Sequence, residues 1–290
     1  MPPTTQQVAI VTDSSVSLPR AMVEEWGIQV APLEVHFGDR PYRDGDDLVP
    51  DAFYQMLQTA DPLPTTSAPK PASFLDAFRR ASPTARHVVC LTLAARFSAT
   101  YDSARAAAEL ARQALPELTI HVVDTHTAVS AEALVVLAAA KAARQGRGLE
   151  EVLEVCYSVM ERVTLIAFLD TLRFVWRSGR IPWVAAWMGD ALSVKPMLEL
   201  KEDEARLVAR PRTRSRATER LLREVERRTR GRPLVVNVVH AADPEGAHYL
   251  CQRVQARFDC REAFVSEFSP AIGVHTGPGL LGLAFYALEV

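Results

Sequence analysis

The sequence predicts an α/β protein of two domains, and three observations lead to this prediction. Short, continuous apolar segments alternate with segments of helical periodicity through the first half of the chain, as in a parallel sheet with helical crossovers. The same alternation resumes after Gly148. The 290 residues, of which 48% are hydrophobic and 23% charged, suffice for two buried cores and exclude a disordered chain.

The first half contains four predicted strands with helices between them. The strands span residues 8–12, 28–37, 88–93 and 120–124, and the helices span residues 51–60, 73–81, 103–115 and 130–145. The last two strands are continuously apolar, which is typical of strands buried on both faces of a parallel sheet. We therefore expect residues 1–148 to form an N-terminal Rossmann-like domain.

The second half contains a further α/β unit. A helix at 149–162 has its apolar positions on one face and is predicted to bridge the two halves. It is followed by strands at 163–169, 234–239 and 263–268, helices at 215–230 and 244–258, and a last apolar segment at 280–288. Residues 171–198 are predicted to be rich in loops. We expect residues 149–290 to form a C-terminal α/β domain.

Charge and cysteine content narrow the class of protein. A formal net charge of −2 argues against nucleic acid as the main partner. The four cysteines form no Cys-x-x-Cys pair, so we expect reduced thiols in a cytoplasmic protein. The polar start at residues 1–7 shows no signal peptide. The longest apolar run, 133–140, is too short to span a bilayer, which takes about 20 residues, and is predicted to be a buried helix.

Polar residues follow the predicted strands. They include Asp13-Ser14-Ser15 and residues 93–101 and 124–127, and a hydroxyl-rich, proline-stiffened loop is expected at 64–71. Ligands of an open parallel sheet bind beyond the carboxyl ends of its strands, so these hydroxyls and nearby backbone N–H groups could hold a carboxylate or a phosphate. The alternative is that Ser, Thr and Asp serve there only as helix caps.

Two further segments contain unusual residues. Gly273, Gly277 and Gly279 surround His275, which suggests a close backbone approach and a histidine directed at a ligand, although a lone histidine is more often a core residue. The second segment, Arg177-Ser-Gly-Arg-Ile181, is predicted to be a loop whose arginines reach an anion or an acid at the domain interface.

Taken together, these segments resemble the DegV family of bacterial fatty-acid-binding proteins, which includes the FakB subunits of fatty acid kinase. The resemblance runs almost from end to end. The matching motifs are Val8-Ala-Ile-Val-Thr-Asp-Ser-Ser15, Pro32-Leu, Tyr42-Arg-Asp-Gly45, Phe53-Tyr54, Thr66-Ser-Ala-Pro69, Phe97-Ser-Ala-Thr-Tyr101, Arg177-Ser-Gly-Arg-Ile181, Lys195-Pro196 and Gly273-Val-His-Thr-Gly-Pro-Gly279.

The resemblance implies a long-chain fatty acid buried in a tunnel, with its carboxylate held between two α/β domains. A separate ATP-dependent kinase would use the presented carboxylate to make acyl phosphate for phospholipid synthesis. The chain itself would be a binding protein with no cofactor and no catalysis of its own. The residues agree with a binding role, because the sequence has no Walker A motif. Chain length and unsaturation of the ligand, the kinase and the oligomeric state are not given by the sequence.

The resemblance also assigns site residues. Thr66 and Ser67 match the hydroxyl loop at the carboxylate, His275 matches the histidine of the same network, and Arg180 matches a loop arginine tied to that network or to the kinase.

One departure concerns the loop after the third strand. The family usually has Ser-Ser and Ser-Gly-Thr there, whereas this chain has Ala94-Ala95 and Ser98-Ala99-Thr100. We expect Ser98 and the backbone N–H of Ala95 to serve at the carboxylate. A lost hydroxyl costs about 1 kcal/mol, so ligand choice or carboxylate pose could differ.

Three alternatives remain open at this point. A hydrolase would combine Ser14 or Ser98 with His275 and Asp124, but no Gly-x-Ser-x-Gly elbow is present. Residues 206–232 contain eleven arginines and could form a helix that binds nucleic acid, an acidic partner or, transiently, a membrane surface. A solvated amphipathic helix explains that segment better, so we expect no nucleic acid. The seven histidines are dispersed, and no metal site is predicted.

Overall fold

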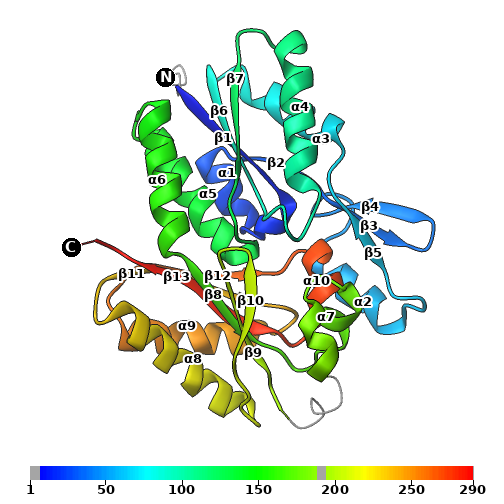
Figure 1. Ribbon diagram of the computed structural model, residues 1–290, viewed down its shortest axis with the longest axis vertical. Helices are drawn as coiled ribbons and strands as arrows, with labels where there is room; N and C mark the ends of the chain where they lie inside the picture. The colour runs from blue at the N-terminus through cyan, green and yellow to red at the C-terminus, as the bar shows by residue number, and fades with distance from the viewer. Residues whose placement is uncertain (1–6, 188–193, 290) are drawn as a thin grey trace.

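The computed structural model describes residues 7–187 and 194–289, and it has the predicted α/β architecture (Figure 1). Of the polar start, residues 1–6 lie outside these ranges. The described residues form a four-stranded, a six-stranded and a three-stranded sheet. The first two lie one above the other in Figure 1, and the small sheet lies to their side.

The four-stranded sheet is entirely parallel, with the strand order β2-β1-β6-β7. Its strands are β1 (Val8–Asp13), β2 (Gln29–Ala31), β6 (His87–Thr92) and β7 (Thr119–Asp124). Helices α3 (Pro71–Ala81) and α4 (Thr100–Ala114) cover one face. Helix α5 (Val129–Arg144) covers the other face, where it also contacts α1 (Arg20–Trp26). This is the predicted N-terminal sheet, although α3 starts two residues earlier than expected.

The six-stranded sheet is mixed. Its order is β10-β9-β8-β13-β11-β12, and only β11 and β12 pair in parallel. The strands are β8 (Thr164–Phe168), β9 (Met197–Lys201), β10 (Glu204–Ala209), β11 (Leu234–His240), β12 (Cys260–Glu267) and β13 (Leu281–Ala287). Helices α8 (Arg214–Thr229) and α9 (Pro244–Arg257) cover one face. The β9–β10 hairpin was not predicted.

Helix α5 joins the two larger sheets. It contacts β1 on one side and β11 and β13 on the other, so it is buried nearly all round. The prediction of a buried helix around residues 133–140 is confirmed. Helix α6 (Leu149–Arg162) packs beside α5 and contacts β6 and β13, as expected of a bridging helix. The two sheets take their strands from either side of residue 148, but the division into domains at that point stays a prediction.

The three-stranded sheet corrects two predictions. It has the antiparallel order β4-β3-β5, with β4 (Arg40–Arg43), β3 (Glu34–Phe37) and β5 (Thr65–Ser67). The prediction of a single strand over residues 28–37 is therefore wrong. Pro32, which lacks an N–H group, separates β2 in the large sheet from β3 in the small one. The expected loop at 64–71 contains β5.

The remaining elements surround the joint between the sheets. They are η1 (Ser14–Val16), α2 (Pro50–Thr59), α7 (Arg173–Ser178), η2 (Pro182–Trp187) and α10 (Pro270–Thr276). The stretch 171–198 thus contains short helices, and its residues 188–193 lie outside the described ranges. None of the helices in the described part of the chain is both long and apolar enough to cross a bilayer.

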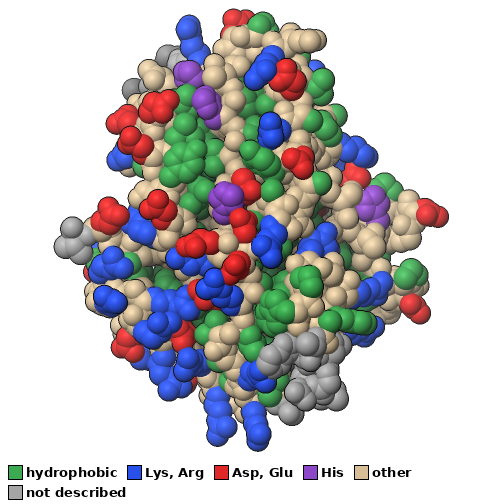
Figure 2. Space-filling model, viewed as in Figure 1, with side chains coloured by type: hydrophobic (Ala, Val, Ile, Leu, Met, Phe, Trp, Pro, Cys, Tyr) green, Lys and Arg blue, Asp and Glu red, His purple; other side chains and the backbone are tan. Residues whose placement is uncertain are grey.

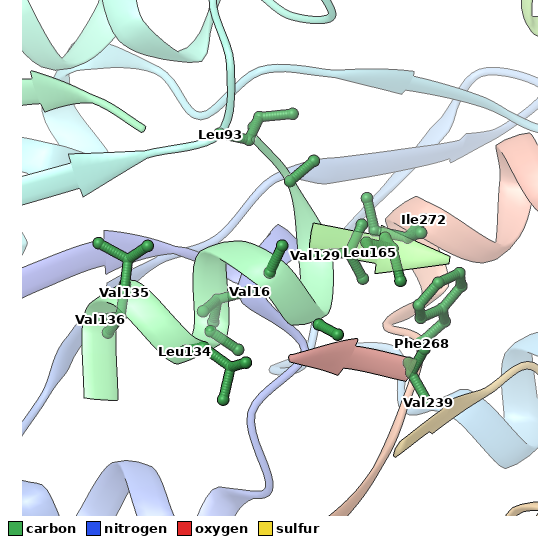
Figure 3. Close-up of a cluster of buried hydrophobic side chains, with 14 of the residues drawn as sticks. Val16, Leu93, Val129, Leu134, Val135, Val136, Leu165, Val239, Phe268 and Ile272 are labelled. Atoms are coloured by element: carbon green, nitrogen blue, oxygen red, sulfur yellow. The ribbon is translucent and has the colours of Figure 1, made fainter. Parts of the chain in front are cut away.

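One apolar cluster spans both halves of the molecule. Figure 3 shows part of it, with Val16, Leu134, Leu165, Phe268 and Ile272 drawn from segments far apart in the sequence. All of them are buried. Because the two sheets share this core, they hold each other in place. The cluster also reaches α10, which has His275 in its last turn.

Candidate functional site

Helix α10 presents His275, and its neighbours fix its position closely. A Cβ on Gly273 would lie 2.5 Å from the Phe53 ring, and one on Gly277 would lie 2.2 Å from the Phe174 ring. Gly277 also has a φ of +67°, which favours glycine. These contacts confirm the close backbone approach predicted around His275. They hold α10 against α2 and α7.

Three of the predicted site residues form one hydrogen-bonded chain. The His275 Nε2 atom lies 2.7 Å from Thr66 Oγ1, across 209 residues of sequence. Its Nδ1 atom lies 3.1 Å from Arg180 Nη1. Thr66 comes from β5 and Arg180 from the segment after α7. The structure therefore brings together residues from the small sheet, α10 and the α7 loop.

The direction of these hydrogen bonds follows from the chemistry of the arginine. A guanidinium only donates, so Nδ1 of His275 must accept. Burial, with the Arg180 guanidinium nearby, lowers the pKa of His275 to about 3, so the ring is neutral near pH 7. The single ring proton then sits on Nε2 and is donated to Thr66. The Thr66 hydroxyl has no other hydrogen bond in the described part of the chain, so its own proton is free to be donated to a ligand.

Arg180 is a partly buried cation without an acidic partner in the described ranges. Its Nε donates to the carbonyl of Phe97 at 3.0 Å, and its Nη1 bonds His275. Burial lowers the pKa of its guanidinium. A desolvated cation gains free energy when an anion binds beside it. Together with the Thr66 hydroxyl, Arg180 makes this location suited to a carboxylate.

The loop after β6 lies next to Arg180 through the Phe97 carbonyl. In that loop the backbone N–H of Ala95 donates to Asp124 Oδ2 at 3.2 Å, and the Ser98 hydroxyl lies 2.8 Å from that of Thr100. Ala95 and Ser98 thus have partners of their own. Neither residue is hydrogen-bonded to the Thr66–His275–Arg180 chain. Their role at a carboxylate stays a prediction.

Ser67 lies apart from this chain of residues. Neighbouring residues of a strand point to opposite faces, so the side chains of Thr66 and Ser67 leave opposite faces of β5, and a role of Ser67 at a carboxylate stays a prediction. The Ser67 hydroxyl lies 3.0 Å from His36 Nε2 and 3.4 Å from Glu34 Oε2. The structure therefore does not bring Ser67 to His275, because the segment predicted to be a loop is a strand.

Two buried aspartates position the site. Asp13 accepts hydrogen bonds from the backbone N–H groups of Ser15 and Leu93, the latter at the start of the loop after β6. Asp44 accepts from the Ser14 hydroxyl at 2.6 Å and from the N–H of Ala271 in α10 at 3.1 Å. Burial raises the pKa of each aspartate to about 6. The Asp13-Ser14-Ser15 segment is thus buried and hydrogen-bonded internally.

Tyr54 belongs to the Phe53-Tyr54 motif and lies beside the site. Its hydroxyl is 3.0 Å from where a Cβ of Gly273 would stand. The hydroxyl is buried and has no hydrogen-bond partner among the described residues. The spacing of three and four residues between Phe53, Tyr54 and Leu57 in α2 is typical of the buried face of a helix, but no sequence signal reveals an unpartnered hydroxyl.

The candidate residues of the hydrolase alternative do not form a catalytic triad in the described structure. His275 is hydrogen-bonded to Thr66 and Arg180, so no carboxylate orients its ring. The Ser14 hydroxyl donates to Asp44, and Asp124 accepts from the N–H groups of Ala95 and His126. The nucleophile, base and acid of that hypothesis are therefore each engaged elsewhere.

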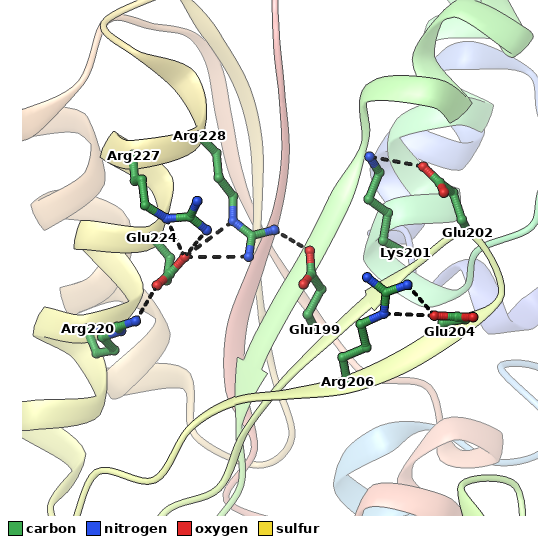
Figure 4. A network of polar contacts seen from close by, with 9 residues as sticks. All are labelled: Glu199, Lys201, Glu202, Glu204, Arg206, Arg220, Glu224, Arg227 and Arg228. Carbon is green, nitrogen blue, oxygen red and sulfur yellow. Dashed lines mark hydrogen bonds and ion pairs between the residues drawn. The ribbon is translucent and has the colours of Figure 1, made fainter.

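The arginines of residues 206–232 are largely paired within the molecule. Figure 4 shows Glu224 bonded to Arg220, Arg227 and Arg228, and Arg228 also bonds Glu199. The expected stripe of Leu221, Leu222 and Val225 is fully buried, which confirms an amphipathic helix. The segment is not one helix, because Arg206 lies on β10 and α8 begins at Arg214.

One group of residues has the ligand types of a metal site. Atoms of Asp124, His126 and Asp203 lie within 4.8 Å of one another. His126 Nδ1 is 2.6 Å from Asp203 Oδ2, and the N–H of Asp203 donates to the His126 carbonyl. The group thus ties the turn between β9 and β10 to the segment after β7. The spacing of histidines and acidic residues in the sequence could not reveal this group, because Asp203 is 77 residues from His126.

Comparison with known proteins identifies the family. The family model described as "Uncharacterised protein, DegV family" matches residues 7–288. A DegV domain-containing protein of Streptomyces coelicolor, SCO2569, is 36% identical over 280 residues, which cover 96% of this chain and 98% of that protein. The chain belongs to the DegV family, as its motifs predicted.

Solved structures of the family show the same fold. A fatty-acid-binding DegV family protein of Thermus thermophilus is 32% identical and has a TM-score of 0.88, covering 97% of this chain and 100% of its own. A stearic acid-binding protein of Eubacterium ventriosum is 27% identical with a TM-score of 0.87, covering 97% and 98%. The fold class is thereby confirmed, and these relatives bind fatty acids.

Proposed function

We propose that this chain binds one long-chain fatty acid and holds its carboxylate at Thr66, His275 and Arg180. The observation that carries the proposal is the ordered chain of hydrogen bonds from Arg180 through His275 to Thr66. It leaves one hydroxyl proton and one cation without an acidic partner at the same location in the described structure. Relatives that share the fold and bind fatty acids support it.

The acyl tail would lie in the apolar region shared by the two sheets. Phe268, Ile272 and Leu165 lie in the cluster of Figure 3, which reaches α10 next to His275. Burying a 16-carbon tail at about 0.8 kcal/mol per methylene stabilises the complex by roughly 12 kcal/mol before association costs. The polar end then mainly fixes orientation and satisfies a desolvated carboxylate.

The bound carboxylate would be presented to a separate ATP-dependent kinase for acyl-phosphate formation and phospholipid synthesis. The carboxylate would be presented at Arg180. The loop after α7 that contains Arg180 is partly exposed, so a kinase could reach the carboxylate from there. In this proposal the chain is a cytoplasmic binding protein without catalysis of its own. The fatty acid is its ligand, and it has no cofactor.

Denaturing extraction of the purified protein, followed by mass spectrometry of the organic phase, tests the binding proposal. We expect a stoichiometric long-chain fatty acid, whose mass also gives chain length and unsaturation. An empty protein that also fails to bind added palmitate and oleate would contradict it. Such a result would mean that Ala94 and Ala95 mark a loss of lipid binding in this chain.

Presentation to a kinase is tested separately. The loaded protein is incubated with ATP, alone and with the fatty acid kinase catalytic subunit of the same organism, and acyl phosphate is trapped with hydroxylamine. We expect hydroxamate only when both proteins are present. Product from this chain alone, or none with the kinase, would overturn this part of the proposal.

A further inference from the structure

The outer edge of β7 is an unprotected sheet edge. Within the described residues β7 pairs only with β6, in an unbroken register from Thr119 to Asp124. In Figure 1 it lies at the front with no element over it, and Figure 2 shows backbone and hydrophobic side chains exposed on this upper part of the face. Ile120 and Val122 are only partly buried there. Such an edge offers unpaired N–H and C=O groups to another strand.

The other edges of the two large sheets are blocked. β2 has three residues, and the Arg80 guanidinium donates to its Val30 carbonyl at 2.9 Å. Strand β10 contains a register shift between Leu207 and Ala209, and β12 pairs with a shift near its start. Short strands, charged side chains and bulges are the usual devices against edge pairing. β7 is six residues long, has no register shift and contains no lysine or proline. Its one charged side chain, Asp124, lies at the end of the strand, where it accepts from the N–H groups of Ala95 and His126.

Helix α4 lies alongside this edge and has a self-complementary charge pattern. An open groove of about 490 Å³ lies where α4 packs along β7, and it is lined by Ile120, Val122 and four exposed charged residues of α4. These are Asp102, Arg105, Glu109 and Arg112. About the centre of the helix, at Ala107, each negative residue is mirrored by a positive one. Asp102 is mirrored by Arg112, and Glu109 by Arg105.

We propose that the β7 edge and α4 form a homodimer interface with a second copy of this chain. A two-fold axis perpendicular to the sheet near His121 would place Ile120 opposite Val122 of the second copy, on the α4 face of the sheet. The same axis would set the two α4 helices antiparallel, because a two-fold axis perpendicular to a helix reverses its direction. Ile120 and Val122, on either side of His121, line one groove with α4 residues from Tyr101 to Arg112, so the axis also passes near the middle of α4. Asp102 of each copy then meets Arg112 of the other.

This arrangement joins two four-stranded sheets into one of eight strands. Interfaces of this isologous kind need a surface that is complementary to itself, which the mirrored charges supply. The groove between α4 and β7 would be closed by the second copy. The charge pattern therefore favours a second copy over an unrelated partner.

Analytical ultracentrifugation of the purified protein over a wide concentration range tests the interface, with a charge swap as the decisive variant. Asp102 and Arg112 lie about 15 Å apart along α4, so they cannot pair within one chain. We expect Arg112→Asp and Asp102→Arg each to weaken dimerisation by about tenfold or more, because each places like charges opposite one another twice. The double variant should restore the wild-type dissociation constant.

Arg79→Asp is the matched control. Arg79 is an exposed helix arginine that pairs with Asp76 three residues earlier, just as Arg112 pairs with Glu109. This variant should dimerise like the wild type, and circular dichroism should show that all four variants are folded. A wild-type protein that is monomeric at all concentrations would overturn the proposal. So would single variants that dimerise normally, or a double variant that is not rescued.

Discussion

Thr65 and Thr66 are adjacent threonines on β5 that point to opposite faces, and only Thr66 bonds His275. We predict that Thr66→Ala lowers the affinity of the delipidated protein for oleate roughly tenfold, because a desolvated carboxylate loses a hydrogen bond. Thr65→Ala is the control and should leave the affinity unchanged. Fluorescence displacement titration measures both. Equal affinities for the two variants would contradict the placement of the carboxylate.

Ser67 is also expected to be neutral in this assay. The sequence resemblance assigns it to the carboxylate, whereas the structure places its hydroxyl on His36 and Glu34. Side chains alternate between the two faces of a strand, so the position of a residue within the strand decides whether it faces a ligand. A strand of three residues between prolines gives almost no periodic signal from which this position could be predicted. For this reason the sequence could name the hydroxyl segment but could not distinguish Thr66 from Ser67.

Tyr54 allows a second test of a single side chain near the site. Its buried hydroxyl has no partner in the described residues, so removing it should not destabilise the ligand-free protein. We predict that Tyr54→Phe leaves the free energy of unfolding unchanged or raises it by about 1 kcal/mol. Urea denaturation of the delipidated protein provides the measurement. A loss of stability would show that the hydroxyl has a partner in solution.

At the scale of elements, the position of α10 depends on Asp44. Its carboxyl group accepts from the N–H of Ala271, and burial raises its pKa from 3.8 to about 6. The folded protein therefore holds this proton more tightly than the unfolded chain does. The resulting stabilisation is complete below about pH 3.8 and is lost as the pH rises through about 6.

Asp44→Asn removes this dependence. Between pH 4 and pH 7 its free energy of unfolding should rise relative to that of the wild type, by up to about 3 kcal/mol for two pKa units. Asp46→Asn, which changes an exposed aspartate of the same turn, should follow the wild-type profile. Denaturant unfolding at several pH values measures the difference. A constant difference between Asp44→Asn and wild type would show that Asp44 is not the titrating group.

The elements that the sequence predicted well are those with strong periodicity. The four strands of the parallel sheet begin near their predicted positions, and α5, α6, α8 and α9 were each predicted within a few residues. The small sheet and the β9–β10 hairpin were not predicted, because their strands are short or charged and are held by tertiary pairing. Pro32 is the one local signal that could have divided the predicted strand at residues 28–37.

At the scale of the whole molecule, the site exists only because distant segments meet. Arg180 and His275 are 95 residues apart, and Thr66 is 209 residues from His275. Their assembly depends on α5, which joins the two large sheets, and on the core that those sheets share. Motif order could suggest that these residues act together, but the direction of their hydrogen bonds required the structure.

In the proposed binding mode, this chain of hydrogen bonds recognises a carboxylate at the end of an apolar tail. The most direct test compares the affinity of the delipidated protein for oleate with that for methyl oleate, which has the same tail and no anionic group. We predict that oleate binds at least about tenfold more tightly, because its carboxylate accepts a charge-assisted hydrogen bond from Thr66 and neutralises Arg180, whereas the ester carbonyl is a weaker acceptor without charge. Equal affinities would contradict recognition of the carboxylate and show that the tail alone determines binding.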